Sequence, residues 1–368
     1  MSAHAKLSPS GGEKWMTCPG AIHLEATVPD TDQSSEHAAR GTAIHELSER
    51  CLINDSEPKG YIGEVINRVT IDSEMAEIAN VYVTYVREMV GMKLYEKRVS
   101  LDHIIPDCFG TVDCVAMRPG HLIIADLKSG AGIPVSAEDN KQLMIYALGA
   151  LKEFDWIYDF EKVSLVIVQP PLQNISTWTI TVDELMKFAD QLKLAYEAIT
   201  NEPTKYVLSD KGCRWCKAKP VCPEQKRIAQ EAAARDFSAM TAKDIAESLE
   251  LIPLIKQFIA AVEGYAKDSI ISGKTIPGWK VVEGRRSRAW ANETAVIKFF
   301  ESKGLDDKIF TEPELLSVAQ LEKKMKEIDV DFSALIETKQ GQPTLAKEDD
   351  KRDAIEKGTR AAKDFANV

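Results

Sequence analysis

Two aspartates and a lysine stand on neighbouring strand-like segments, where they could bind a metal ion. The turn RPGH joins the two segments as a hairpin, and its length pairs Met117 with Leu122. Counting back along both strands places Asp113 opposite Asp126, with Lys128 on the same face because side chains alternate along a strand. Opposed like charges cost up to about 1 kcal/mol, whereas a divalent cation such as Mg²⁺ or Mn²⁺ is held by such carboxylates. The alternative is a solvent-facing pair of aspartates that the lysine neutralises.

Two further polar pairs fall on predicted helices. In RGTAIHELSE, His45 and Glu49 are four residues apart and share one helix face. In QLMIYALG, Gln142 and Tyr146 have the same spacing on the helix after the acidic strand, and polar side chains on its inner face need partners. A site at the edge of the sheet would supply those partners. The alternative for His45 is a structural role, which is common for a helical histidine, and we interpret Glu49 as structural.

Three cysteines in GCRWCKAKPVCPEQ form a C-x2-C-x5-C cluster. They provide three thiolates, one fewer than the four that a zinc ion or an iron–sulfur cluster usually takes. Seven unevenly spaced cysteines in a large chain favour metal ligands or reduced thiols over disulfides. For the fourth ligand, Cys114 is expected to point into the core and Cys51 to be a small buried hydrophobe, while Cys108 and Cys18 lie in irregular segments. The cluster consists of Cys213, Cys216 and Cys222, and its segment is basic through Lys211, Arg214, Lys217 and Lys219.

A predicted α/β unit positions these residues. The acidic hairpin, the helix after it and the apolar run VSLVIVQP form a β-α-β crossover, so the sheet is mixed. Thr181 or Asp183 is expected to cap the last helix of the unit. Helices are expected at 34–53, 73–92, 138–153 and up to 199, and strands at 94–101, 111–117, 121–129, 163–170 and 176–180.

The last third of the chain carries no catalytic constellation. We expect a boundary between residues 1–238 and 239–368, with a mostly helical second region whose polar end, from 339, is partly mobile. Within it, GWKVVEGRRSRAWA is expected to form a short hairpin. Its basic residues beside tryptophans could hold a DNA strand by phosphate contact and stacking; a solvated hairpin with buried tryptophans is the alternative. These residues are Lys280, Arg285, Arg286 and Arg288, with Trp279 and Trp290.

The composition restricts the class of protein. The chain has 368 residues, 44% hydrophobic and 28% charged, and a net charge of −11. This charge argues against a generic polyanion-binding surface, although binding depends on local patches. The sequence lacks an apolar run of membrane-spanning length and a secretory signal, so we expect a cytoplasmic protein.

Four motifs in this order carry a resemblance to a known family. The chain resembles the RecB-like branch of the PD-(D/E)XK nucleases over about residues 12–230, which implies a restriction-endonuclease-like core with a mixed sheet flanked by helices. The motifs are G-T-x-x-H ending at His45, G-T-V-D ending at Asp113, D-L-K from Asp126 to Lys128, and Q-x-x-x-Y from Gln142 to Tyr146.

The resemblance implies a role for each motif residue. Lys128 would be the catalytic lysine, Gln142 and Tyr146 would line the site and position DNA, and Glu96 matches a glutamate with a supporting role. The metal would be held by His45, Asp113, Asp126 and the backbone carbonyl of Leu127.

The resemblance also supplies the fourth cysteine. RecB-like nucleases with an iron–sulfur cluster have one cysteine before the histidine motif and three after the Q-x-x-x-Y helix, which matches Cys18, Cys213, Cys216 and Cys222. CRISPR-associated exonucleases and the nuclease subunit of bacterial helicase–nucleases are similar in this respect. A 4Fe-4S cluster is therefore expected, acting as a structural clasp; a structural Zn²⁺ on the same cysteines is the alternative.

Together these features predict a metal-dependent deoxyribonuclease. We expect an exonuclease that acts at DNA ends in phage recombination, repair or replication, since the tail and core together look like an uncharacterised phage and prophage nuclease family. Its partners would be DNA ends or single strands, with a single-strand annealing protein or a helicase as candidate protein partners. The alternative is a non-catalytic DNA-end-binding scaffold of a recombination complex, and an RNA-processing enzyme differs only in substrate.

Overall fold

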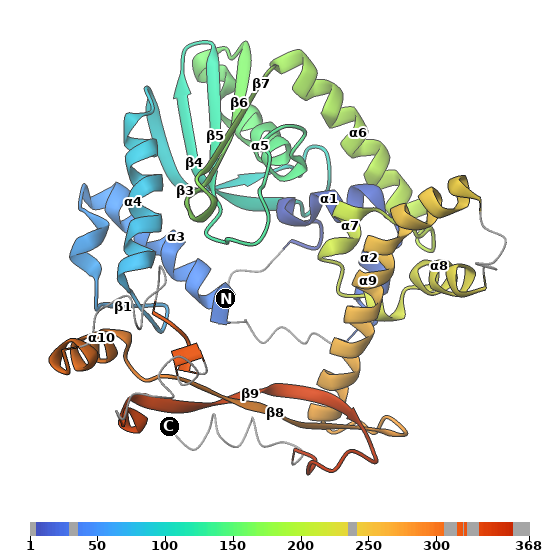
Figure 1. Cartoon of the computed structure of the whole chain (residues 1–368). Helices are drawn as coiled ribbons and strands as arrows, with labels where there is room; N and C mark the ends of the chain where they lie inside the picture. Colours follow the sequence, from blue (N-terminus) through green and yellow to red (C-terminus); the bar gives the residue numbers. More distant parts are fainter. Residues whose placement is uncertain are drawn as a thin grey trace. The chain divides into compact units, whose positions relative to one another are not determined.

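A five-stranded mixed sheet forms the centre of the larger part of the chain (Figure 1). The structure is a computed structural model, which describes residues 5–28, 36–234, 241–304, 315–318, 320–321 and 331–355. The strands lie in the order β3-β4-β5-β6-β7; β5 and β6 are parallel and the other neighbours antiparallel. The strands are β3 (Met92–Ser100), β4 (Phe109–Arg118), β5 (His121–Leu127), β6 (Lys162–Gln169) and β7 (Asn174–Thr181).

The parallel pair of strands is explained by the helix between them. Helix α5 (Lys141–Tyr158) begins at Asn140, whose side chain accepts a hydrogen bond from the backbone N–H of Leu143, and returns the chain to the start of β6. The predicted β-α-β crossover is confirmed. The cap at Thr181 is also confirmed, since Thr181 and Glu184 form a capping box at the start of α6 (Val182–Asn201).

Helices cover both faces of the sheet (Figure 1). Helices α5 and α6 pack on one face, where the larger apolar cluster lies. Helices α3 (Glu36–Asn54) and α4 (Ser73–Glu88) pack on the other, against apolar side chains that alternate with the first set along β4, β5 and β6. The molecule therefore contains a mixed α/β core, as predicted. The remaining elements of this part are α1 (Gly12–Thr17), α2 (Ala21–Glu25), α7 (Asp210–Arg214), α8 (Pro223–Ala233), β1 (Val65–Ile66) and β2 (Val69–Thr70).

The chain divides into two compact units, Met1–Ile259 and Ala260–Val368, and the division falls within the long helix α9 (Ala242–Ile271). The second unit also contains β8 (Trp279–Trp290), α10 (Glu293–Ser302) and β9 (Ile336–Lys347). Its apolar core includes Trp290, Phe300 and Leu321. None of the helices in the described parts of the chain is long and apolar enough to span a membrane.

The predicted hairpin in GWKVVEGRRSRAWA is wrong. Residues 279–290 form one continuous strand, β8, which pairs antiparallel with β9, a segment that begins 46 positions after the end of β8. The glycine that suggested a turn, Gly284, instead lies where the pairing register shifts on either side of it. The polar segment from 339 contributes to β9 as far as Lys347, so this part of the expected mobile end is a strand.

Candidate active site

A histidine and two carboxylates from three elements meet at one edge of the sheet. The possible metal-ligand atoms of His45 on α3, Glu96 on β3 and Asp113 on β4 all lie within 4.8 Å of one another. Among the described residues, this is the one such group of three or more histidine, cysteine, aspartate or glutamate side chains. An imidazole with carboxylates is a donor set suited to a divalent cation.

The strand register brings the two aspartates together. Met117 pairs with Leu122, as predicted, and the ladder continues to Cys114 and Ala125. One further step in the same register places Asp113 opposite Asp126. The Asp113 carboxylate accepts a hydrogen bond of 2.7 Å from the backbone N–H of Leu127 and lies 3.4 Å from Nδ1 of His45. Leu127, whose carbonyl is the predicted fourth ligand, is therefore beside this carboxylate.

Glu96 has a backbone conformation that is unusual for a strand. Its φ is +43°, in the left-handed region, while Tyr95 pairs with Cys114 and Lys97 with Val112 on either side. The register therefore sets Glu96 opposite Asp113, and the ladder is interrupted at this pair. Such a conformation costs about 1 to 3 kcal/mol and persists where its surroundings hold it. The strain turns a carboxylate towards the site.

Asp126 and Lys128 form a second group with α5. Lys128 Nζ lies 2.7 Å from Asp126 Oδ2 and donates a hydrogen bond of 3.0 Å to Oε1 of Gln142. The amide nitrogen of Gln142 lies 3.1 Å from Asp126 Oδ1 and 3.2 Å from the hydroxyl of Tyr146. All four sequence-predicted residues are thus joined in one network. Asp126 lies outside the three-residue ligand group, although its charge acts on His45.

The protonation behaviour of the site follows from burial and an excess of carboxylates. Burial lowers the pKa of His45, but Asp113, Asp126 and Glu96 outweigh this and raise it to about 9. Burial and the neighbouring Asp113 raise the pKa of Glu96 to about 7. The pKa of Asp126 is raised by burial, which the charge of Lys128 partly offsets. All three pKa values are raised because negative charge is unfavourable in the site, and a bound cation would stabilise that charge.

The motif glycines allow close approaches around the site. A Cβ at Gly110 would lie 2.8 Å from a ring carbon of Tyr146 and 2.8 Å from Pro9, so only glycine lets the tyrosine approach β4 so closely. A Cβ at Gly41 would lie 3.1 Å from the hydroxyl of Ser129, so α3 passes close to the segment that follows Lys128. Close packing therefore explains why glycine occupies these two positions.

Sequence reasoning missed Tyr82 on α4. Its side chain is 2% exposed, and its hydroxyl has no hydrogen-bond partner among the described residues. Burial, with smaller contributions from Asp113, Cys114 and Asp126, raises its pKa well above the usual value. Its position in an amphipathic helix predicts only a core residue. A buried donor that experiences the charges of the site is a feature that the fold alone reveals.

The buried oxygens of the site fit a cation. Asp126 is 3% exposed, and its Oδ2 has no hydrogen bond of good geometry, despite the nearby lysine ammonium. A carboxylate oxygen in this state is available to a hard cation. The carboxylates present therefore fit Mg²⁺ or Mn²⁺, which prefer oxygen ligands.

The four cysteines of the predicted cluster line one small cavity, together with side chains from both ends of the larger unit. Cys18 ends α1, while the others lie on or beside α7 and α8. Backbone N–H groups point at two of the sulfurs, from Val207 to Cys18 and from Ser209 to Cys213, each at 3.4 Å. The thiols are Cys18, Cys213, Cys216 and Cys222.

The other three cysteines are core residues, as predicted for Cys51 and Cys114, whereas the sequence left the place of Cys108 open. Cys51, Cys108 and Cys114 are each 0% exposed. Burial raises the pKa of both Cys108 and Cys114 to about 12. They are therefore thiols packed in the core, and none of them lines the cavity of the four cysteines.

Comparison with known proteins places the chain in a family. Residues 4–353 match the family model described as "Protein of unknown function (DUF2800)". The chain belongs to this DUF2800 family. It is also similar to the solved structure of SSO0001, at 14% identity over 61% of this chain and 88% of that chain, with a TM-score of 0.33. A phage-related exonuclease from Haemophilus somnus 129PT shares 12% identity over 50% of this chain and 95% of its own, with a TM-score of 0.20.

Some of the basic residues of this DUF2800 protein that were predicted to bind DNA form ion pairs or hydrogen bonds with neighbouring residues. Arg214 pairs with Asp210 at 2.7 Å, and Lys219 donates a hydrogen bond to the carbonyl of Arg214. Lys211 and Lys217 have exposed side chains. On β8, the side chains of Arg286 and Arg288 are exposed as well. The side chain of Arg285 lies outside the described residues.

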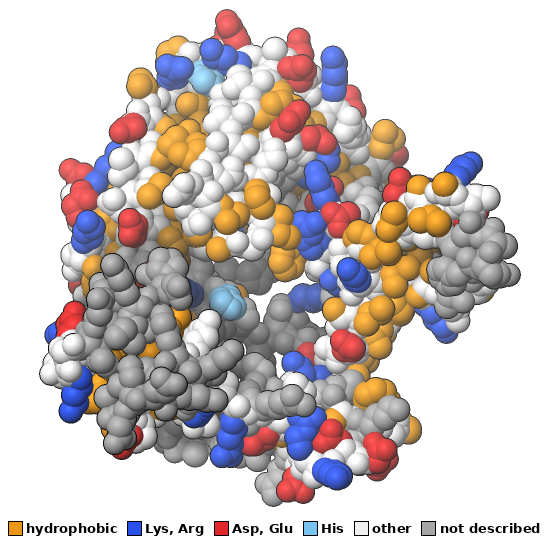
Figure 2. Space-filling model, in the orientation of Figure 1, with side chains coloured by type: hydrophobic (Ala, Val, Ile, Leu, Met, Phe, Trp, Pro, Cys, Tyr) orange, Lys and Arg blue, Asp and Glu red, His pale blue; other side chains and the backbone are white. Residues whose placement is uncertain are grey.

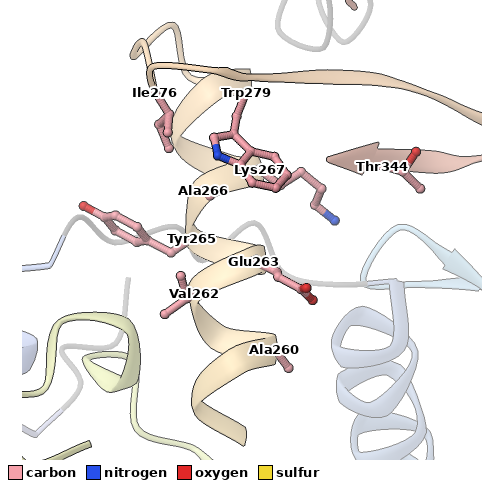
Figure 3. A pocket seen from close by; sticks show the side chains of 10 residues that line it. Ala260, Val262, Glu263, Tyr265, Ala266, Lys267, Ile276, Trp279 and Thr344 are labelled. Atoms are coloured by element: carbon pink, nitrogen blue, oxygen red, sulfur yellow. The ribbon is translucent and has the colours of Figure 1, made fainter. Parts of the chain in front are cut away.

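The smaller unit of the DUF2800 chain contains a separate pocket of about 860 Å³ (Figure 3). It lies between α9, the start of β8 and β9. Trp279, Lys267 and Thr344 point into the region on one side of the helix, and Tyr265 lies on the other side (Figure 3). None of the predicted catalytic or metal-ligating residues lines this pocket.

Proposed function

We propose that this protein is a metal-dependent DNA nuclease of the RecB-like PD-(D/E)XK type. One observation carries the proposal: the His45, Glu96 and Asp113 group lies beside a buried aspartate–lysine pair. Metal-dependent phosphodiester hydrolysis uses a bound divalent cation, and a positive side chain can stabilise the charge that develops on the phosphate. The group of His45, Glu96 and Asp113 provides ligands for the cation, and Lys128 provides the positive side chain. The substrate class, DNA ends processed by an exonuclease in phage-type recombination, repair or replication, follows from the motif resemblance.

Lys128 is held in a position from which it can act on a phosphate. Its ammonium donates one hydrogen to Gln142 and forms an ion pair with Asp126. The ammonium keeps a further hydrogen to donate to a phosphate oxygen, where charge grows as the bond breaks. Burial lowers the pKa of Lys128, but Asp126 and Asp113 together raise it more, so the group stays charged.

The other residues of the site hold the reacting groups in place. His45, Asp113 and Asp126, with Glu96 beside them, would bind Mg²⁺ or Mn²⁺. When bound, the cation supplies Lewis-acid charge and lowers the pKa of a water molecule. Gln142 orients both Asp126 and Lys128, and Tyr146 positions Gln142 by its hydroxyl. The substrate strand would lie across the polar ends of α5 and β5.

We further propose that the four cysteines hold a 4Fe-4S cluster as a structural clasp. Tetrahedral zinc with bonds of about 2.3 Å requires sulfurs about 3.8 Å apart. The four cysteines do not form a group with three ligand atoms within 4.8 Å of one another in the described chain. The wider spacing supports a larger cluster, and the N–H groups directed at sulfur are typical of the surroundings of such clusters.

A cleavage assay with end-labelled linear, circular and single-stranded DNA tests the nuclease proposal. With Mg²⁺ or Mn²⁺ we expect cutting of linear DNA only, and the Asp126→Asn variant should lose about 10³-fold or more of the rate while remaining folded. Asp190→Asn, a change of an exposed aspartate on α6, serves as the matched control. Undiminished cutting by Asp126→Asn would contradict the proposal. Binding of DNA ends without cutting under either cation would instead favour a scaffold role, and cleavage of RNA alone would change the substrate class.

A further inference from the structure

Two of the six tryptophans expose most of their surface to solvent. Trp215, between α7 and α8, is 79% exposed, and Trp156 near the end of α5 is 83% exposed. Tryptophan is highly buried on average in folded proteins, so a ring this open to solvent is available to a ligand. The two residues differ in the charge around them, which allows a comparison.

The two tryptophans lie in segments of opposite charge. Residues 211–219, around Trp215, contain four basic residues and no acidic residue. Residues 152–160, around Trp156, contain three acidic residues and one basic residue. In a chain with a net charge of −11, the local positive charge favours a polyanion at Trp215 and disfavours one at Trp156.

The loop that carries Trp215 is held on both sides by the cavity of the four cysteines. Cys213 and Cys216 flank the tryptophan and line that cavity, and the backbone N–H of Cys216 donates to the carbonyl of Cys213 at 3.2 Å. A ring on a loop held in this way loses little conformational entropy when a planar group stacks on it. Lys211 and Lys217 have exposed side chains on the same segment. Figure 2 shows several Lys and Arg side chains on the visible face around the place of α7 in Figure 1.

Helix α1 lies between this loop and the candidate active site (Figure 1). A Cβ at Gly12 would lie 2.8 Å from Ile145, and a Cβ at Gly212 would lie 3.5 Å from Thr17, so α1 packs on both α5 and α7. Packed helices have axes about 8 to 10 Å apart, so α7 lies no more than about 20 Å from α5, which carries Gln142. At about 3.4 Å per nucleotide of a stacked strand, about six nucleotides span this distance.

We propose that Trp215 stacks on a base of a single-stranded DNA overhang whose end lies in the active site. Lys211 and Lys217 contact phosphates of the same strand, since a basic surface with an aromatic ring holds single strands by charge and by stacking. A base inside a duplex already stacks on its neighbours, so the ring selects an unpaired strand. The path of the strand rests on the proposed nuclease function, whereas the stacking on Trp215 stands apart from it.

Binding of a fluorescently labelled single strand, measured by anisotropy without a divalent cation, tests the stacking apart from cleavage. With an oligothymidine of about 12 nucleotides, Trp215→Ala should raise the dissociation constant about tenfold or more, and Trp215→Phe should raise it less because a phenyl ring still stacks. Trp156→Ala is the matched control and should bind as the wild type does. Trp215→Ala should also unfold at the urea concentration of the wild type, since the ring is mostly in solvent. Equal binding by Trp215→Ala and the wild type would overturn the proposal.

The salt dependence of the same binding tests the two lysines. Each phosphate contact to a single strand contributes about 0.7 to the slope of log affinity against log salt. The double variant Lys211→Gln with Lys217→Gln should therefore lower this slope by about 1.4. An unchanged slope would reject the phosphate contacts, and binding that strengthens with salt would indicate an apolar partner in place of DNA.

Cleavage of duplexes with short and long single-stranded overhangs, in both 5′ and 3′ forms, tests the path. An overhang of about 12 nucleotides reaches Trp215 from the active site and one of about 3 does not, so the wild type should cut the longer one faster. Trp215→Ala should remove this difference and leave the rate on the short overhang unchanged. The same advantage of the long overhang in both proteins would reject the path. A wild type that cuts neither substrate would refute the nuclease function and the path, while weaker binding by Trp215→Ala would still establish the stacking.

Discussion

Glu96 is the residue whose conformation is most clearly explained by the site rather than by its strand. A strand residue with φ of +43° does not pair regularly in the ladder. Its backbone conformation is unfavourable and persists only where other interactions compensate for it. Here the gain is a third possible metal-ligand atom within 4.8 Å of those of His45 and Asp113. A glutamate in a strand is not by itself a signal for this role, because the backbone conformation is invisible in the sequence.

Removing the charge of Glu96 should weaken metal binding more than it weakens the fold. We expect Glu96→Gln to bind Mn²⁺ about tenfold or more weakly, because an amide oxygen is a poorer ligand than a carboxylate for a hard cation. Titration calorimetry with Mn²⁺ on the unliganded protein measures this directly. Glu74→Gln, at a side chain 75% exposed, controls for loss of one surface charge. Equal Mn²⁺ affinity in wild type and Glu96→Gln would show that Glu96 is not a ligand.

At the scale of elements, a chain of hydrogen bonds through a buried histidine joins four adjacent strands, β4 to β7. Arg118 donates to Nδ1 of His121 at 3.0 Å, so Nε2 carries the proton and donates to Ser164 at 2.8 Å, which in turn lies 2.7 Å from the Thr179 hydroxyl. Burial, with the charges of Arg118 and Lys162, lowers the pKa of His121 below 6.5. The imidazole is therefore neutral in the folded protein at neutral pH.

This histidine should make the protein less stable in mild acid. Between the lowered folded pKa and the unfolded value near 6.5, the unfolded chain binds more protons than the folded one. The contribution of His121 to the free energy of unfolding should therefore fall as the pH drops below about 6.5, by about 1.4 kcal/mol for each unit of pKa difference, and should stay constant above it. Urea unfolding of wild type and His121→Asn at pH 7.5 and 5.5 measures the effect. An equal loss in both proteins would mean that His121 is not the cause.

The cavity of the four cysteines lies between the first helices and the segment after α6. Glu25 of α2 connects the two sides, since it accepts a hydrogen bond from the backbone of Lys217 and pairs with Lys14. If a cluster bridges these segments, it closes a loop that spans most of the core, and closing long loops stabilises by up to about 4 to 5 kcal/mol in the chain-entropy model.

Replacement of the first cysteine tests the clasp. We expect Cys18→Ser to lose iron and the visible absorption of anaerobically purified protein, and to unfold at lower urea concentration. Cys51→Ser is the matched control, because Cys51 is buried away from the cavity; it should keep its iron. A full iron content in Cys18→Ser would exclude Cys18 as a ligand, and colourless protein with stoichiometric zinc would identify the alternative metal.

The helices and strands of the core could largely be predicted from the sequence, because residues close in the sequence determine where they begin and how they pair. The RPGH turn sets the register that aligns Asp113 with Asp126, and Thr181 with Glu184 fixes the start of α6. The pairing of β8 with β9 could not be predicted, because its partner is distant in sequence and Gly284 resembles a turn residue. Glu96 was expected near the site only from the motif resemblance, and its left-handed backbone conformation was not evident from the sequence. The position of Tyr82 was not evident either, since it depends on helix packing.

At the scale of the whole molecule, two apolar cores are separate. The first unit is built around the five-stranded sheet, and the second around Trp290, Phe300 and their neighbours. Units with their own cores can unfold independently. We therefore expect a substitution in one core to lower the stability of the unit that contains it and to leave the stability of the other unit unchanged.

A core substitution in the smaller unit should reveal this independence. Phe300 is 0% exposed and contacts Phe299 and Phe332 through ring-edge geometry. We expect Phe300→Ala to lower the stability of its unit by about 3 to 5 kcal/mol, and to shift one of two transitions in urea. Ile167→Ala, in the core of the sheet, should shift the other transition. A single transition that both substitutions shift would show that the two units unfold together.

The convergence of Cys18 with three cysteines beyond residue 212 has a consequence for synthesis. A ribosome adds about 5 to 20 residues per second, so Cys18 leaves it on the order of ten to forty seconds before Cys213 follows. During that interval the four-thiol cavity is incomplete, although much of the sheet is already available to fold. An iron–sulfur cluster could therefore bind in this cavity only after the whole core has been translated. Truncated products would emerge without their clasp and be more readily degraded.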